Sequence, residues 1–254
     1  MFMRKNITTL LAMVIVTTSA MAEDVSAYLI SASAPLSDVQ SKLESNGFDV
    51  LATTRNVITI TNPELQASNT YVATLHVYVG ASDVRVQNPA YFGAAYLQDA
   101  YTKGQFKNTV AALTKALGSM TGSKEKLDSS DIADYHFMMS MPYFQDAITV
   151  AEGVNIDKKV AGNANIAYSL PLPSGALLVG HKLNDSINGF LATLGQTANS
   201  QILPYEALVY SNKVLMMNPK YYLALSLPQL TMSQFMKISF IPAEIEADIK
   251  KAYK

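Results

Sequence analysis

Residues 75–89, LHVYVGASDVRVQNP, are matched without a gap by residues 205–219, YEALVYSNKVLMMNP, which lie 130 positions further along the chain. Each stretch is a β-rich run, a short polar turn and a second run that ends in Asn-Pro, a pattern that predicts a β-hairpin. Asn88 and Asn218 are good helix N-caps, and the proline after each suits the first helical position. The chain therefore contains the same strand–turn–strand–helix unit twice.

Patterns on either side of the hairpins predict further matching elements. In the first copy we expect strands over residues 27–32, 48–53 and 56–61, and helices over residues 35–46 and 106–117. In the second copy we expect strands over residues 136–141, 164–170 and 176–180, and helices over residues 142–151 and 243–254. Asn62 and Asn184 each mark the start of a short helix. These elements predict an α+β fold of two tandem two-layer domains with mainly antiparallel sheets, forming an internal pseudo-dimer.

The predicted domain boundary is the segment 118–131, GSMTGSKEKLDSSD. Its polar, charged and Gly/Ser-rich composition is typical of an interdomain linker. We therefore expect a first domain over residues 23–117 and a second over residues 132–254.

The N-terminal residues 1–22 read as a cleavable signal peptide. Arg4 and Lys5 precede an apolar stretch that is too short for a membrane anchor, and small residues stand at both positions that a signal peptidase reads before Glu23. An N-terminal anchor helix is the alternative. The pattern favours Sec-type export with cleavage after Ala22, and it predicts a periplasmic protein. No later stretch is apolar for long enough to span a membrane.

The composition excludes several classes of function. The 254 residues include no cysteine, which rules out disulfides, thiol nucleophiles and thiolate metal sites. A formal net charge of −1 gives no electrostatic footprint for nucleic acid. The hydrolase motifs G-x-S-x-G and H-E-x-x-H are absent, and Gly118 to Lys124 lacks the spacing of a phosphate-binding loop.

The chain resembles the DUF302 domain family in two tandem copies, the second divergent. The resemblance rests on residues 46–50 (NGFDV), on residues 57–67 (VITITNPELQA) and on the two hairpins with their Asn-Pro endings. It implies a compact two-layer α+β fold, often paired as dimers, and it implies no established activity. Many members carry cysteines near the positions of Thr61 and Leu75, so any thiol-based role in the family does not apply to this chain.

A soft-metal site is one candidate function. His136 and Met138 would share one face of the predicted strand over residues 136–141, and Met216 on the second hairpin could add a third ligand. Imidazole and thioether groups suit Cu(I). A histidine and methionine pair could also ligate haem without a covalent bond, through His136 or His181. Methionines that fill gaps in the core are the alternative.

Aromatic side chains follow both Asn-Pro elements. Tyr91, Phe92, Tyr221 and Tyr222 could line a small-molecule groove between each hairpin and its helix. The alternative is that these rings anchor the helix to the core. With no catalytic motif present, we expect non-enzymatic binding of a small ligand or a protein partner, with copper or haem handling as the second hypothesis. A homodimer is a further possibility.

Overall fold

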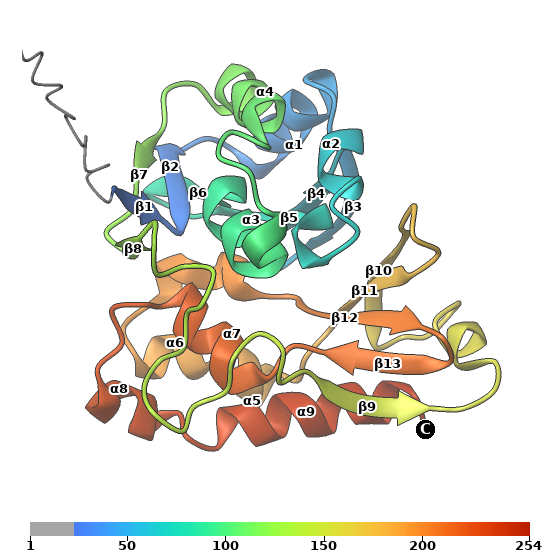
Figure 1. The fold of residues 1–254 in the computed structure, drawn as a ribbon. Helices are drawn as coiled ribbons and strands as arrows, with labels where there is room; N and C mark the ends of the chain where they lie inside the picture. Colours follow the sequence, from blue (N-terminus) through green and yellow to red (C-terminus); the bar gives the residue numbers. More distant parts are fainter. Residues whose placement is uncertain (1–22) are drawn as a thin grey trace, which may run out of the picture.

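The computed structural model of the protein describes residues 23–254 (Figure 1). The predicted signal peptide, residues 1–22, lies outside the described residues. Within the described chain the fold is α+β with mainly antiparallel sheets, as the sequence predicts. None of the helices in this part of the chain combines the length and apolar character that a membrane crossing requires.

The first half of the molecule, residues 23–131, contains most of its strands in one sheet. Its strands are β1 (Asp24–Ser26), β2 (Tyr28–Ala32), β3 (Asp49–Thr54), β4 (Val57–Thr61), β5 (Leu75–Val79), β6 (Asp83–Gln87), β7 (Thr121–Gly122) and β8 (Lys126–Asp128). Its helices are α1 (Leu36–Ser45), α2 (Pro63–Gln66), α3 (Pro89–Leu97) and α4 (Lys107–Leu117), with the 3-10 helices η1 (Tyr71–Ala73) and η2 (Gln98–Ala100).

The second half, residues 132–254, contains a second sheet. Its strands are β9 (Ile148–Glu152), β10 (Ile166–Pro171), β11 (Leu177–His181), β12 (Tyr205–Tyr210) and β13 (Lys213–Met216). Its helices are α5 (Asp185–Asn188), α6 (Phe190–Thr193), α7 (Pro219–Ser226), α8 (Met232–Lys237) and α9 (Ile241–Ala252), with the 3-10 helices η3 (Ile156–Lys159) and η4 (Thr197–Ile202).

The two main sheets share one strand order. The first runs β3-β4-β5-β6-β2-β7 and the second runs β10-β11-β12-β13-β9, so in each main sheet the strand that comes first in the chain pairs with the second strand of the hairpin. The register agrees with the sequence repeat, because Val77 pairs with Val86 in one hairpin and Ala207 pairs with Met216 in the other. The structural repeat that the sequence indicates is therefore present at the level of sheet topology.

Both Asn-Pro elements begin helices as predicted. The Asn88 side chain accepts a hydrogen bond from the Ala90 amide at the start of α3, and the Asn218 side chain accepts one from the Lys220 amide at the start of α7. Asn62 caps α2 in the same way. The caps hold because an asparagine oxygen satisfies an amide that the first helical turn leaves without a partner.

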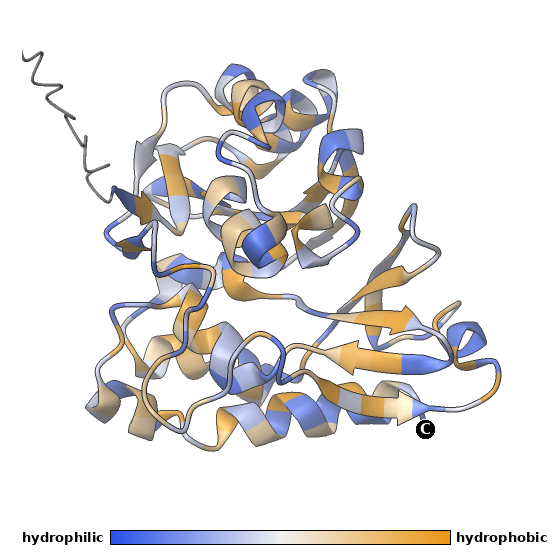
Figure 2. Ribbon diagram, viewed as in Figure 1, coloured by the Kyte–Doolittle hydropathy of each residue, from blue (hydrophilic) through white to orange (hydrophobic). Residues whose placement is uncertain are grey.

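Helices cover the outer side of each half. Helix α1 packs on α4 and β3, and α9 packs on β9 and α7, so these helices lie at opposite ends of the molecule in Figure 1. Hydrophobic residues concentrate in the strands, while α9 alternates hydrophobic and hydrophilic positions (Figure 2). Every residue of β4 is buried, as expected of a strand that is covered on both faces.

The predicted start of the second copy is wrong. Residues 136–141 form turns and bends instead of a strand, and residues 142–151 form no helix. The strand that closes the second sheet is β9, whose Ile-Thr-Val run suits a strand. The Asp146 side chain accepts a hydrogen bond from the Tyr143 amide, and the Asp146 amide donates to the Tyr143 carbonyl at 3.1 Å, so residues 143–146 form an isolated turn.

The segment predicted as a linker, residues 118–131, carries two short strands. Strand β7 pairs with β2, and β8 pairs with β1 to form a separate two-stranded sheet. The segment is thus fixed to the first half before the chain enters the second.

Candidate functional site

A cavity of about 320 Å³ opens between the two halves, and we call it the interface cavity. The turn between β3 and β4 supplies Thr54 and Arg55 from the first half. The second half supplies the end of β11 and the segments around α5, α6 and η4. Slightly more than half of the wall is apolar, and this part includes Leu183, Leu191 and Leu203. Apolar walls with a few convergent polar groups are typical of small-molecule sites.

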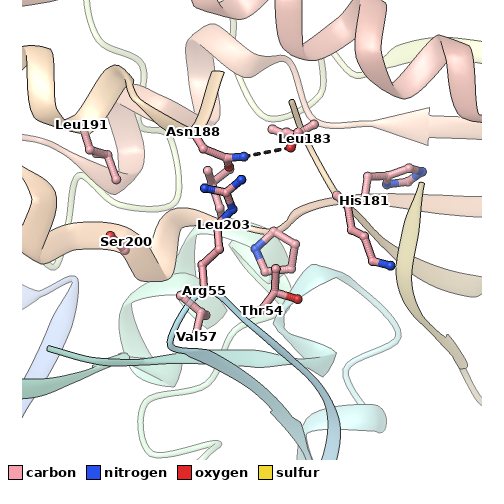
Figure 3. A pocket seen from close by; sticks show the side chains of 11 residues that line it. Thr54, Arg55, Val57, His181, Leu183, Asn188, Leu191, Ser200 and Leu203 are labelled. Atoms are coloured by element: carbon pink, nitrogen blue, oxygen red, sulfur yellow. Dashed lines mark hydrogen bonds between the residues drawn. The ribbon is translucent and has the colours of Figure 1, made fainter. Parts of the chain in front are cut away.

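Arg55 lies in a two-residue hairpin turn. Arg55 has φ +50° and Asn56 has φ +63°, the left-handed pair of a type I′ turn. Asparagine, aspartate and glycine are the usual residues there, and a long side chain at positive φ costs about 1 kcal/mol. The Arg55 side chain extends from the turn toward Asn188 and Leu183 on the opposite wall (Figure 3). A residue that is unfavourable for its turn thus places a guanidinium in the cavity.

Positive charge dominates the interface cavity. Arg55 and Lys182 line it, and no carboxylate belongs to its wall. Asp185 at the start of α5 forms an ion pair with Arg55 just outside, where a neighbouring depression begins. Because the side chains of Arg55 and Asp185 are 55% and 90% exposed, this ion pair contributes little to stability. The guanidinium can therefore exchange this partner for an anion at small cost.

His181 adds no positive charge to the wall near neutral pH. Its side chain is 1% exposed, and burial lowers its pKa to about 4. Its Nδ1 lies 3.2 Å from the Tyr205 carbonyl oxygen and its Nε2 lies 2.8 Å from the Tyr253 hydroxyl. Both ring nitrogens thus have protein partners. That arrangement fits a neutral structural imidazole. The haem hypothesis requires a ring nitrogen that can bind iron, and His181 offers none in this arrangement.

A buried group of polar side chains joins the halves beside the cavity, and we call it the central polar cluster: Thr74, His76, Tyr168, Gln201 and Glu206. The Glu206 carboxylate accepts hydrogen bonds from the hydroxyls of Thr74 and Tyr168 and lies 3.7 Å from the His76 imidazole. His76 also contacts the Gln201 carbonyl oxygen at 3.0 Å. The carboxylate raises the pKa of Tyr168, although burial is the larger cause.

Contacts between the halves are reciprocal. His76 and Glu206, which contact each other, occupy equivalent positions in the sequence repeat. The β3–β4 turn contacts α5 through Arg55 and Asp185. The equivalent β10–β11 turn contacts the segment after α2, where the Ser174 amide donates to the Asn69 side chain at 2.7 Å. In the same way η4 packs on β5 while η1 packs on β12.

The four aromatic residues predicted to line a groove lie in the core. Tyr91, Phe92, Tyr221 and Tyr222 are each at most 4% exposed, and none lines the interface cavity. The Tyr91 hydroxyl donates to the Leu225 carbonyl across the two halves at 2.8 Å, and the Tyr222 hydroxyl donates to the Ile202 carbonyl at 2.7 Å. This placement favours the packing alternative.

The proposed metal ligands differ in their surroundings. Met216 is fully buried in β13, whereas Met138 is 41% exposed in the loop before β9. His136 lies in that loop, with its Nε2 3.4 Å from the Tyr143 hydroxyl. The strand that would have aligned His136 with Met138 does not form. Within residues 23–254, no three histidine, aspartate or glutamate side chains form a group that could hold a metal ion. The copper hypothesis stays a prediction without support from this geometry.

Sequence reasoning missed Arg55 and Lys182. A signal for Arg55 was present: the dipeptide Arg-Asn stands between two β-branched runs, at a turn position where a bulky residue is unusual. Lys182 gives no such signal, because a lysine after a strand is ordinary in sequence and only tertiary structure places it in a cavity wall.

Comparison of the chain with protein-family models, with curated proteins and with solved structures found no match in any of the three. The resemblance to the DUF302 family therefore stays a prediction.

Proposed function

We propose that this protein is an exported, non-enzymatic binding protein that holds a small amphipathic anion in the interface cavity. The observation that carries the proposal is the position of Arg55, a guanidinium that extends from an unfavourable turn into a cavity with apolar walls. An arginine fork suits a carboxylate or a phosphate, which it can bind through two parallel hydrogen bonds.

The apolar part of the wall suits an apolar group next to the anionic group of the ligand. Leu183, Leu191 and Leu203 would cover a short hydrocarbon chain or ring, while Lys182 adds a second positive charge. The volume of about 320 Å³ lies at the lower end of the range for ligand sites, so the ligand is small. Transport, sensing and storage all use such binding.

Calorimetric titration of the mature protein with hexanoate, phenyl phosphate and inorganic phosphate tests this function. We expect saturable binding of an amphipathic anion and weak or no binding of inorganic phosphate. Arg55→Asn should weaken that binding at least about tenfold through loss of the charged fork. Because asparagine suits a type I′ turn, the same variant should fold as stably as the wild type.

Two further variants separate the charge at this site from general charge effects. Asp185→Asn removes the competing partner of Arg55 and should strengthen anion binding. Lys213→Asn removes one positive charge beside another two-residue hairpin turn, outside the cavity wall, and should leave binding unchanged. Absence of saturable binding by both amphipathic anions, or equal binding by Arg55→Asn, would contradict the proposal.

The reciprocal contacts support the predicted internal pseudo-dimer as the frame of this site. In a two-fold arrangement equivalent residues meet at the axis, and the contact between His76 and Glu206, which are equivalent in the sequence repeat, supports such an arrangement. The interface cavity breaks this symmetry, because an arginine occupies the β3–β4 turn while Pro173, Ser174 and Gly175 occupy the equivalent turn of the second half.

A further inference from the structure

A second cavity, of about 310 Å³, lies where the connecting segment passes η4 and α7. We call it the Glu125 cavity. Glu125 and Lys124 come from the connection between β7 and β8, and Gln196 precedes η4. Leu227 and Gln229 follow α7. The cavity shares no lining residue with the interface cavity.

The Glu125 carboxylate is buried at this wall with one oxygen unpaired. Its residue is 2% exposed, its Oε1 accepts a hydrogen bond from the Asn199 side chain at 3.2 Å, and its Oε2 has no hydrogen-bond partner. Lys124 lines the same cavity, yet among the described residues no ion pair joins the two side chains.

The backbone fixes Glu125 in this position. Its carbonyl oxygen accepts hydrogen bonds from the Ala27 amide at 2.7 Å and from the Ser123 hydroxyl at 3.2 Å. The next residue, Lys126, pairs with Ser26 in the β1–β8 ladder. The backbone of Glu125 is therefore fixed at the cavity wall, and its buried Oε2 keeps a desolvation cost that no hydrogen bond offsets.

We propose that the Glu125 cavity binds a ligand that carries a primary ammonium group, with the Glu125 carboxylate as its anionic acceptor. An ammonium group donates three hydrogen bonds and supplies the charge that Oε2 lacks. Gln229 offers a second acceptor, because its amide nitrogen donates to the Lys126 carbonyl at 3.2 Å and its Oε1 can accept. Leu227 and Leu230 provide apolar surface for a short carbon chain.

The donor set favours an ammonium group over a metal ion. Calcium takes six to eight oxygen ligands, usually with several carboxylates. This wall offers one carboxylate together with neutral amides and a lysine, a set too poor in anionic oxygen for such an ion. The inference does not depend on the anion proposed for the interface cavity, since the two walls are separate.

Titration of the mature protein with n-butylammonium chloride, followed by calorimetry and by NMR shifts of glutamine side-chain amides, tests the site. We expect saturable binding that is at least about tenfold tighter than binding of tetramethylammonium or 1-butanol, because the former has no N–H donor and the latter no charge. Glu125→Gln keeps the shape and the acceptor for Asn199, and it should weaken n-butylammonium binding by a similar factor.

The controls distinguish this site from the first. Arg55→Asn should leave n-butylammonium binding unchanged, and Glu125→Gln should leave hexanoate binding unchanged. If Glu125→Gln folds poorly, Gln229→Leu, at an exposed position, should still weaken n-butylammonium binding. Lack of saturable n-butylammonium binding, equal binding by folded Glu125→Gln, or tighter binding of calcium or magnesium chloride alone would overturn the proposal.

Discussion

In the first half, the ten-residue helix α1 leads from the first strand of the sheet to the next, whereas the corresponding connection in the second half contains only the short helix η3. The sheets nevertheless keep the same strand order and register. The hairpin and its Asn-Pro cap are therefore the part of the repeat that both halves keep, with matching register and matching helix starts. The outer covering can change without altering the sheet.

The halves also differ at equivalent buried positions near their contact. Glu206 in the second half replaces His76, and by strand register His181 replaces Ile60. Glu206 lies where the two halves meet, against His76. His181 lies in the wall of the interface cavity. The repeat supplies a symmetrical frame, and these replacements make the two halves chemically distinct.

Removal of the carboxylate from the central polar cluster should destabilise the protein more than any other change considered below. Glu206→Ala leaves Thr74, Tyr168 and His76 without their shared acceptor. We expect a loss of about 3 kcal/mol or more in the free energy of unfolding, as is typical when one partner of a buried polar group is removed. Urea unfolding followed by circular dichroism measures it.

Exchange of His76 and Glu206 between their positions tests the same contact. His76→Glu alone places two carboxylates together, and Glu206→His alone places two imidazoles together. The double variant restores one of each, so its destabilisation should be smaller than the sum of the two single effects. A loss below about 1 kcal/mol for Glu206→Ala, or strictly additive effects in the exchange, would show that the two halves do not depend on this contact.

A second effect should appear on acidification, and it comes from the second half alone. Burial lowers the pKa of His181 from its usual value of 6.5 to about 4 in the folded protein. The unfolded chain therefore gains a proton first as the pH falls, so the stabilising contribution is complete above about pH 6.5 and is lost between there and about pH 4. The shift corresponds to roughly 3 kcal/mol.

Replacing His181 by the residue of the first half tests this cause. His181→Ile should flatten the dependence of unfolding free energy on pH between about 7 and 5, measured by urea unfolding, even if stability at pH 7 falls. Tyr253→Phe removes the hydroxyl beside Nε2 but keeps the imidazole buried, so it should retain the wild-type slope. A slope that His181→Ile leaves unaltered would assign the acid sensitivity to other groups.

Sequence reasoning succeeded where local chemistry decides the structure. The hairpins, the Asn-Pro caps and the helices over 35–46, 106–117 and 243–254 all match elements of the fold, with small shifts at the ends. It failed over residues 136–151, because the run around Met138 is as apolar as a strand but has no sheet partner. Strand pairing is a tertiary property that β-propensity alone does not fix.

The interface cavity and the Glu125 cavity could not be predicted from the sequence, for a related reason. Glu125 lies in a segment whose polar composition predicts a solvated linker, and only its pairing with the first half buries it. Arg55 and Lys182 come together from different halves. Each residue type is ordinary at its place in the sequence, apart from the arginine in a tight turn, so the sites emerge only when the halves are assembled.

The two Asn-Pro caps are the most similar feature of the two halves, and we expect only a small difference in unfolding free energy when each cap is removed. Asn88→Ala removes the cap of α3 and also the hydrogen bond from its amide to the Ser26 carbonyl at 2.7 Å. Asn218→Ala removes only the cap of α7. A cap contributes about 1 kcal/mol and an internal hydrogen bond a similar amount, so we expect losses of about 2 and about 1 kcal/mol.

Urea unfolding of both variants beside Asn108→Ala, an exposed asparagine within α4 that gives no cap, measures the difference. Asn88→Ala should lose about twice as much as Asn218→Ala, because the second contact of Asn88 joins the start of α3 to β1. Equal losses would mean that this tie to Ser26 contributes nothing. The two halves would then have equivalent caps, and their asymmetry would lie in the buried polar positions and the turn at Arg55.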